Sequence, residues 1–159
     1  LTTATKMMGA TSNGPRGVSG GGRTTGGVDV VEYITIASTG NAADFGDLVA
    51  ATYMYTGAVS DLTKGLWPGG HRSGYSDAID VLNIASTGDA TDFGNLTDAR
   101  GYAAGCSNGT RGCFGGGYDP GGGGAFNIID YVTVASLGNA SDFGDLTAAR
   151  YVITSTAGD

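Results

Sequence analysis

The chain has 159 residues, of which 31 are glycine and only 14% are charged. Glycine at this density argues against long helices, because each glycine inside a helix costs about 1 kcal/mol relative to alanine. The formal net charge of −7, without a cluster of lysine and arginine, disfavours both a nucleic-acid partner and insertion into an anionic membrane.

A segment of nearly constant sequence occurs three times, and the copies begin at Ile36, Ile84 and Val134. Self-similarity at a period of about 50 residues is the mark of a repeat architecture. We therefore divide the chain into repeat unit 1 at residues 1–48, unit 2 at 49–96 and unit 3 at 97–146. Residues 147–159 form the start of a fourth unit.

Each unit is expected to contain four short strands, the first of which lies at 4–10, 51–58 and 99–106. These runs of small and aromatic residues are bounded by Gly, Asn and Ser, as is typical of strands. A hairpin turn follows at 12–15, 60–63 and 107–110, and two of the three turns contain Asn-Gly, which tolerates positive φ. Each turn ends at a cation, which is Arg16, Lys64 or Arg111.

The second strand of each unit runs into consecutive glycines at 17–22, 65–70 and 112–117. We expect Gly21, Gly70 and Gly116 to serve close backbone approach and unusual φ. A loop follows at 23–27, 71–76 or 118–124. Because the length of this loop varies between units, we expect the loops to carry the function.

The third strand, at 28–36, 78–84 and 127–134, is rich in β-branched and aromatic residues, and the fourth is centred on Phe45, Phe93 or Phe143. The expected fold class is therefore all-β. Residues 148–154 align with the beginning of unit 3, so a strand of a fourth unit is predicted there. Such an edge strand would be open to another chain or to a continuation of the same chain.

Cys106 and Cys113 flank the turn of unit 3, so they are predicted to face each other across a hairpin. A disulfide and a pair of thiols both fit this arrangement. Two thiols are favoured, because the aligned pairs in the other units, Ala58 with Leu66 and Ala10 with Val18, are plainly apolar.

The order of residues within a unit resembles the kelch repeat. Unit 3 carries it most fully, with Arg100, an apolar strand ending in Gly115-Gly116, Asp130-Tyr131, Phe143 and the following Arg150. Phenylalanine replaces the usual tryptophan of the family, and Thr52 stands where unit 2 should have arginine. The repeated sequence Gly-Asn-Ala-x-Asp-Phe-Gly-Asp-Leu most resembles kelch-like repeats in virion proteins of phages and other aquatic viruses.

The resemblance implies kelch-like β-propeller blades, with three four-stranded antiparallel units plus one extra strand. Propellers close with four to eight blades. Three units therefore require either a longer chain or the association of copies, and two copies would supply six.

The tripeptide Asp-Phe-Gly begins at Asp44, Asp92 and Asp142. In protein kinases it binds magnesium, but the other kinase motifs are absent from this sequence. Its fixed period predicts a structural role, in which the aspartate caps its turn and the phenylalanine fills the space between units. Calcium at Asp44 with Asp47, or at Asp142 with Asp145, would have too few oxygen ligands. We expect no metal and no cofactor.

His71 is the single histidine, so no catalytic His–carboxylate–nucleophile set repeats. It is expected either to be a plain exposed loop residue or to join Trp67 and Tyr75 in contacting sugar. The candidate ligand or partner residues of the variable loops are Trp67, His71, Arg72, Tyr75, Tyr118 and Asp119.

The leading expectation is a non-enzymatic structural or appendage protein of a virion, or an extracellular protein. It would bind other protein subunits, including copies of itself, and host-surface glycan. One alternative is a secreted carbohydrate-active propeller enzyme, which would need two carboxylates about 5–9 Å apart. Another is a cellular kelch-type interaction module.

Overall fold

The computed structural model describes residues 4–53 and 57–155. Throughout this part of the chain the regular secondary structure is β-strand, and the all-β prediction is confirmed. A helix long and apolar enough to cross a membrane is absent from the same residues.

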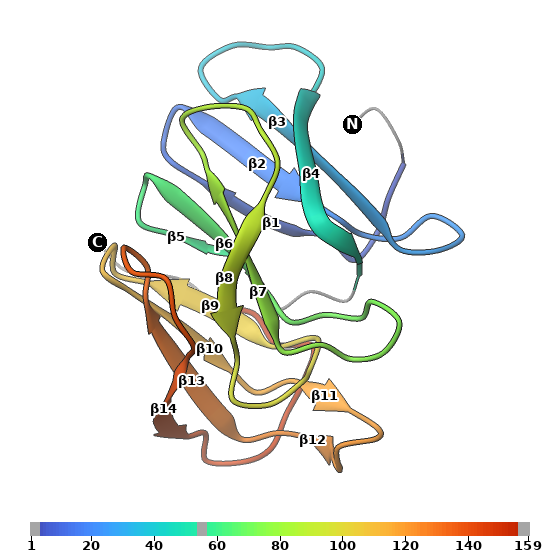
Figure 1. Ribbon diagram of the computed structural model, residues 1–159, viewed down its shortest axis with the longest axis vertical. Helices are drawn as coiled ribbons and strands as arrows, with labels where there is room; N and C mark the ends of the chain where they lie inside the picture. Colours follow the sequence, from blue (N-terminus) through green and yellow to red (C-terminus); the bar gives the residue numbers. More distant parts are fainter. Residues whose placement is uncertain (1–3, 54–56, 156–159) are drawn as a thin grey trace.

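Three four-stranded antiparallel sheets follow one another along the chain, one in each predicted unit, and Figure 1 shows them side by side in sequence order. Consecutive strands are paired in each sheet, so each is a simple meander. Sheet 1 contains β1 (Gly9–Ser12), β2 (Arg16–Gly20), β3 (Val28–Thr35) and β4 (Ala43–Thr52). Sheet 2 contains β5 (Val59–Ser60), β6 (Lys64–Pro68), β7 (Ala78–Asn83) and β8 (Thr91–Asn95). Sheet 3 contains β9 (Ala104–Ser107), β10 (Arg111–Gly115), β13 (Ile128–Thr133) and β14 (Ser141–Asp145).

The predicted hairpin turns join the first and second strands of each sheet. In unit 1 the Asn13 carboxamide oxygen accepts the backbone N–H of Arg16 at 2.9 Å, and Asp61 and Asn108 make the same bond in units 2 and 3. The next residue of each turn is left-handed, with φ of 89° at Gly14, 72° at Leu62 and 80° at Gly109. Leu62 is therefore a strained residue in a position that suits glycine.

The hydrophobic core lies between the sheets. One cluster joins Val18 and Val31 of sheet 1 to Trp67 and Leu82 of sheet 2. A second cluster joins sheet 2 to sheet 3 in the same way. Phe45 belongs to the first cluster and Phe93 to the second, and both are 2% exposed. The prediction that these phenylalanines fill the space between units is confirmed for this pair.

Several boundaries differ from the sequence expectation. The first strands are shorter and begin later than predicted, and residues 54–56 of the run 51–58 lie outside the described residues. The loop 118–124 contains a small hairpin of β11 (Tyr118–Asp119) and β12 (Gly124–Ala125), which the glycine-rich sequence did not suggest.

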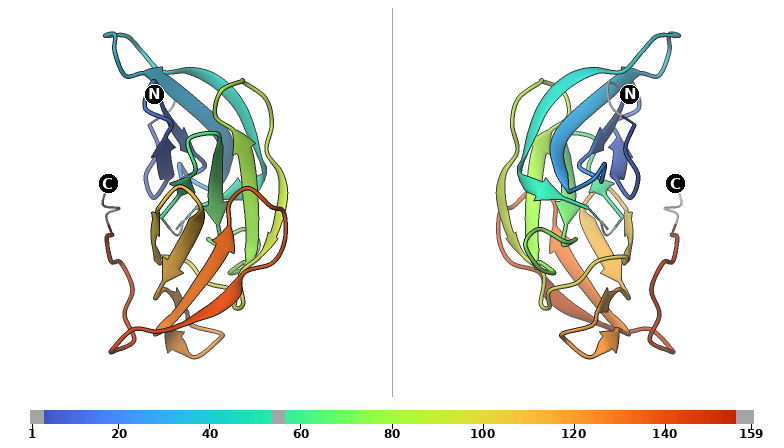
Figure 2. Two further views of the ribbon diagram at one scale, coloured as in Figure 1. Left: turned by 90° about the vertical axis from the view of Figure 1, so that its left-hand side faces the viewer. Right: turned by 90° about the vertical axis from the view of Figure 1, so that its right-hand side faces the viewer.

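The expectation of a strand at 148–154 is wrong, because no strand is found in the described residues after Asp145. The segment nevertheless runs beside unit 3, since the Val152 N–H donates to the Tyr102 carbonyl oxygen at 3.0 Å. Figure 2 shows this C-terminal segment extending along the side of the last sheet. The equivalent residues 98–103 of unit 3 likewise precede its first strand, which begins at Ala104.

Cys106 and Cys113 are directly paired in the register of β9 and β10, as predicted, and both are free thiols at half-buried positions. Burial raises the pKa of the Cys113 thiol, and the neighbouring Cys106 adds to this effect.

Candidate binding surfaces

The junction between neighbouring units is a repeated set of hydrogen bonds. Between units 1 and 2, Gly88 N–H donates to the Phe45 carbonyl oxygen at 2.8 Å and Ala90 N–H to that of Asp47 at 2.7 Å. Asp47 N–H in turn donates to the Asp89 carboxylate at 3.0 Å. The turn after the third strand of one unit is thereby attached to the fourth strand of the preceding unit.

The junction between units 2 and 3 repeats these bonds at the equivalent residues. Gly138 N–H donates to Phe93 O at 2.8 Å, Ala140 N–H to Asn95 O at 2.7 Å, and Asn95 N–H to the Asn139 side chain at 3.1 Å. The cations that end the hairpin turns also cross the junctions. Arg16 donates to Ala85 O at 3.0 Å, and Lys64 donates to Ala135 O at 2.7 Å.

Glycine is required where the two units meet. A Cβ added at Gly46 would lie 2.5 Å from the carbonyl oxygen of Gly88, and one at Gly94 would meet Gly138 in the same way. Both glycines also have φ values, 143° and 146°, that side chains rarely adopt. The near-identical Asp-Phe-Gly segments therefore reflect unit-to-unit packing.

The two ends of the described array carry the two halves of this junction. Phe143 is 55% exposed, although the equivalent Phe45 and Phe93 are buried, and a Cβ at Gly144 would meet nothing within 4 Å. We call Phe143, Gly144 and Asp145 the β14 edge. At the opposite end, residues 39–42 are equivalent to 87–90 and 137–140, whose backbone N–H groups make the two junctions, and we call residues 39–42 the first-unit turn.

A row of aromatic side chains crosses the loops between the second and third strands, which project on the right-hand side of Figure 1. His71 lies 4.9 Å from Tyr53 and 5.3 Å from Tyr75, and Tyr118 lies 6.3 Å from Tyr75 and 4.8 Å from Tyr151, between ring centroids. Burial raises the pKa of Tyr75, with a smaller contribution from neighbouring tyrosines and Asp119. The Tyr75 hydroxyl thus stays protonated at neutral pH.

Part of this row lines a groove of about 650 Å³ to which all three units and the C-terminal segment contribute residues. Such a volume and an aromatic lining are typical of small-ligand sites. The residues around it are Met7, Met8, Tyr75, Tyr102, Tyr118, Tyr151 and Val152.

Three of the six loop candidates lie in this row and three do not. The expected proximity of His71 and Tyr75 is found, and Tyr118 of the third loop lies beside Tyr75 as well. The prediction that Trp67 contacts a ligand is wrong, because the side chain is 0% exposed and its indole N–H donates to the Gly9 carbonyl oxygen at 3.1 Å. Asp119 accepts the N–H of Gly121 at 2.8 Å and so stabilises its own turn.

Arg72 is an ion-pair partner within unit 2. Its guanidinium lies 2.8 Å from the carboxylate of Asp80, and its side chain is 18% exposed. Burial raises the pKa of Asp80, and the charge of Arg72 offsets part of that rise. Arg72 therefore serves the fold rather than the aromatic row.

Tyr53, Tyr102 and Tyr151 were missed by the sequence reasoning. Tyr53 and Tyr151 precede the first strand of a unit at equivalent distances, so the repeat alignment itself contained this signal. The sequence pattern places these tyrosines in strands, whereas in the structure they lie beside the loops.

The repeated aspartates have a local structural role where the structure defines one. The Asp142 carboxylate accepts the N–H of Gly144 at 2.9 Å, but both residues lie within β14, so this bond does not cap a turn. Asp44 and Asp92 are exposed and lie opposite Glu32 and Asp80 in the strand registers. Within residues 4–53 and 57–155, no group of His, Cys, Asp and Glu side chains has the arrangement of a metal site.

Comparison with known proteins gives no family assignment: no family model matches the chain, and no curated protein matches it significantly. The function must therefore be argued from the surfaces described above.

Proposed function

We propose that the chain is a non-enzymatic structural protein whose kelch-like units are arranged as in a β-propeller, and that it assembles with further copies of itself. The observation that carries the proposal is the unit-to-unit junction, which is made twice and has one half at each end of the array. The resemblance of the repeated segment to viral kelch-like repeats supports a place in a virion appendage or in another extracellular assembly.

Two copies are the number that the geometry favours. A junction repeated with the same hydrogen bonds turns each unit by a similar step relative to the one before. Propellers close with four to eight such units, and a chain of three units reaches this range as a multiple of three only at six. The β14 edge of each copy would then bind the first-unit turn of the other.

The expected contacts follow from the two existing junctions. Gly40 N–H would donate to Phe143 O, Ala42 N–H would donate to Asp145 O, and the Asn41 side chain would accept the N–H of Asp145. Phe143 would enter a cluster equivalent to those that hold Phe45 and Phe93.

Residues 152–155 must move aside for this pairing, because they lie beside β9, where the first strand of a further unit belongs. Val152 and Ser155 hold the segment through bonds to Tyr102 O and Gly105 O. Tyr151 and Val152 are 48% and 69% exposed. Because little apolar surface is buried there, we expect displacement to cost little.

Sedimentation equilibrium tests the pairing. The wild-type chain should approach twice the 15.8 kDa of one chain, whereas Phe143→Asp and Asn41→Lys should each be monomeric. An equimolar mixture of the two variants should form a dimer, because one copy keeps an intact β14 edge and the other keeps an intact first-unit turn. Leu137→Asp, at an exposed residue outside both surfaces, is the control.

A wild-type chain that stays monomeric at about 100 μM, a hundredfold above a Kd of about 1 μM, would contradict the proposal. Dimers of both variants that are as stable as the wild-type dimer would contradict the proposed edges.

We also propose that the aromatic row binds host-surface glycan. The half-buried tyrosine rings and the exposed Tyr151 beside the groove offer apolar faces together with hydroxyl groups, and both suit a sugar ring. Tyr118→Ala should weaken binding to an immobilised oligosaccharide panel about tenfold, the size of one good aromatic contact. Tyr131→Ala is the matched control, since Tyr131 stacks beneath Arg111 and lies outside the groove.

If the wild-type chain binds no oligosaccharide on the panel, the glycan part of the proposal fails. The assembly part would stand, because its contacts are made by the β14 edge and the first-unit turn, although the displaced residues 152–155 include Val152 of the groove.

A further inference from the structure

Cys106 and Cys113 lie on the open face of sheet 3. The two residues are register partners in β9 and β10, and Cys113 is also paired with Tyr131 of β13. Register partners project from the same face of a sheet, and successive residues of a strand project from opposite faces. Phe114, the next residue of β10, belongs to the core cluster shared with sheet 2. The two thiols therefore project from the other face, away from sheet 2.

In sheet 2 the corresponding face is buried by the following unit. Leu66 is the counterpart of Cys113, because each stands two residues after the cation that ends the hairpin turn, and the register partner of Leu66 is Val59. Leu66 is 0% exposed and Val59 is 3% exposed. Both belong to the cluster that includes Val132 and Val134 of unit 3. The thiol pair is only half-buried, since the described residues contain no fourth four-stranded sheet to cover it.

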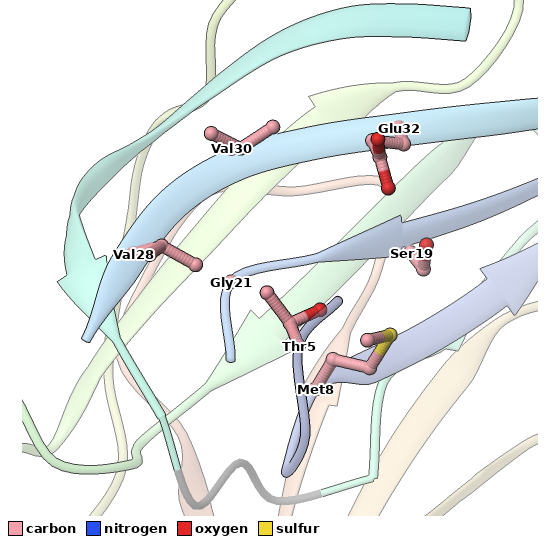
Figure 3. A pocket seen from close by; sticks show the side chains of 7 residues that line it. All are labelled: Thr5, Met8, Ser19, Gly21, Val28, Val30 and Glu32. Atoms are coloured by element: carbon pink, nitrogen blue, oxygen red, sulfur yellow. The ribbon is translucent and has the colours of Figure 1, made fainter. Parts of the chain in front are cut away.

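Sheet 1 has an open face at the other end of the array. Ile34 and Ile36 stand there in the places that Val132 and Val134 occupy in unit 3. The two isoleucines are 46% and 54% exposed, whereas the two valines are 3% and 0% exposed. Figure 3 shows a hollow on the same face beside Ser19 of β2. Exposed apolar residues whose counterparts are buried indicate a surface that a partner covers.

We propose that a second copy covers Cys113 with Ile34 and Ile36 of its first sheet, and that chemical modification of this thiol regulates assembly. The inference rests on the proposed assembly and identifies a regulatory residue in its interface. In the assembly Cys113 would be buried as Leu66 is. A charged group attached to the thiol would then have to enter an apolar cluster, which is strongly unfavourable. The modification and the second copy therefore exclude each other.

Arg111 would not neutralise such a charge in the assembly. It is close enough to Cys113 to offset part of the rise in the thiol pKa. Its counterparts Arg16 and Lys64, however, donate to carbonyl oxygens of the following unit. The equivalent acceptor for Arg111 is the carbonyl oxygen of Ala37 in the second copy, so the guanidinium would be engaged there.

The modifying reagent would be a small disulfide or thiosulfonate. The thiol first loses its proton to solvent, and the Cys113 thiolate attacks one sulfur of the reagent. A new S–S bond forms to Cys113, the S–S bond of the reagent breaks, and its other half leaves as a thiolate or a sulfinate. In the separate chain this attack is open to a half-buried thiol at an uncovered face.

Two thiosulfonates separate the effect of charge from that of size. Methyl methanethiosulfonate leaves a methylthio group, which brings Cys113 close to the size of Leu66. Sulfonatoethyl methanethiosulfonate leaves a group that ends in a sulfonate. Both are applied to a Cys106→Val chain, in which the second thiol cannot displace the adduct and position 106 carries the residue found at Val59.

Sedimentation equilibrium compares each treated sample with the untreated Cys106→Val chain. The sulfonate adduct should raise the Kd of the dimer at least about a hundredfold, because the charge is buried without a partner. The methylthio adduct should change the Kd less than about tenfold, because a side chain of this size fits at the equivalent position.

The rate of modification gives a second measurement. It should fall as the chain concentration rises through the Kd of the dimer, because the assembled thiol is covered. In a chain with Cys106→Val and Phe143→Asp, which should stay monomeric, the rate constant should not depend on chain concentration. A purely structural effect of the adduct would not produce this protection.

A thiol at Leu137 provides the matched control. The chain carries Cys106→Val, Cys113→Leu and Leu137→Cys, so its single thiol lies at a position that is 66% exposed and outside both surfaces. The sulfonate adduct at this position should leave the Kd of this chain as it is before treatment.

An untreated chain that is monomeric would overturn the proposed assembly and this inference with it. A dimer that forms equally well with the sulfonate adduct, or a thiol that reacts at the same rate at every chain concentration, would overturn this inference alone. Equal weakening by the two adducts would also overturn it, because the cover seen at Leu66 accommodates a side chain of leucine size.

Discussion

Removing the Arg100 side chain should destabilise the protein more than almost any other single truncation. The guanidinium is fully buried and donates to Asp130, Gly116 O, Phe114 O and Asp98 O. Breaking one partner out of a buried ion pair typically costs 3–5 kcal/mol, because the other charge stays buried. Asp130 would keep the N–H and hydroxyl of Thr97, at 3.0 and 2.6 Å. We therefore expect Arg100→Ala to cost about 3–4 kcal/mol.

Arg150→Ala is the matched control for this loss. Arg150 occupies the equivalent place after unit 3 but is exposed, so its truncation should change stability by less than about 0.5 kcal/mol. Urea unfolding can be followed by far-UV circular dichroism and by the fluorescence of Trp67, the single tryptophan, which is buried.

Since small proteins are stable by about 5–15 kcal/mol in total, the Arg100→Ala transition should shift clearly to lower urea. If Arg100→Ala lowers the free energy of unfolding by less than about 1 kcal/mol, or if Arg150→Ala lowers it equally, the reasoning is refuted. Either result would mean that the burial of this ion pair does not determine its contribution.

Three further changes have distinct expected outcomes. Phe93→Ala should lower the free energy of unfolding of the monomer by about 3–5 kcal/mol, whereas Phe143→Ala should lower it by less than about 1 kcal/mol, because only Phe93 is buried. Urea unfolding measures both. Leu62→Gly should stabilise the chain by about 0.5–1 kcal/mol, since it relieves a left-handed leucine with φ of 72°; a lower Tm would contradict this. In a Cys106→Ser chain, the Cys113 thiol should react with iodoacetamide at pH 8 more slowly than a model thiol, because burial raises its pKa. Because the pKa of this thiol is higher in the folded chain, the free energy of unfolding should be highest below the pKa of the unfolded thiol. It should fall as the pH rises through the pKa of the folded thiol.

The division into units and most strands could be predicted from the sequence, because both depend on local signals. The hairpin turns at Asn13 and Asn108 contain Asn-Gly, and the third strands are rich in β-branched residues. The strand expected at 148–154 failed for a physical reason. The equivalent residues 98–103 of unit 3 are followed by a complete sheet and are not a strand either, because this part of the repeat connects two units and the first strand begins only at Ala104.

Trp67 shows why the candidate site was harder to predict than the fold. It precedes Pro68 and a glycine pair, so the sequence placed it at the mouth of a loop. Sheet 2, however, lies between two other sheets, and four consecutive residues of β6 are buried, whereas β2 of sheet 1 alternates in part. Burial on both faces removes the alternation by which an inward-facing residue is recognised.

The same limit applies to the Asp-Phe-Gly segments. Their sequences are alike, yet Phe45 and Phe93 are buried and Phe143 is 55% exposed. The burial of each phenylalanine is supplied by the following unit, which lies about 50 residues further along the chain. No local pattern can report whether that unit is present, so exposure at the β14 edge had to come from the structure.

The buried carboxylates show that an arginine missing from one position of the repeat can be replaced by an arginine at another position. Thr52 stands where the kelch resemblance calls for arginine, and from the sequence alone unit 2 looks degenerate. The structure places Arg72, from the loop after the second strand, against Asp80, so the ion pair persists although the sequence position of its cation differs. What the repeat preserves is a buried negative charge in a fixed register and the need to neutralise it, since an uncompensated buried charge is costly.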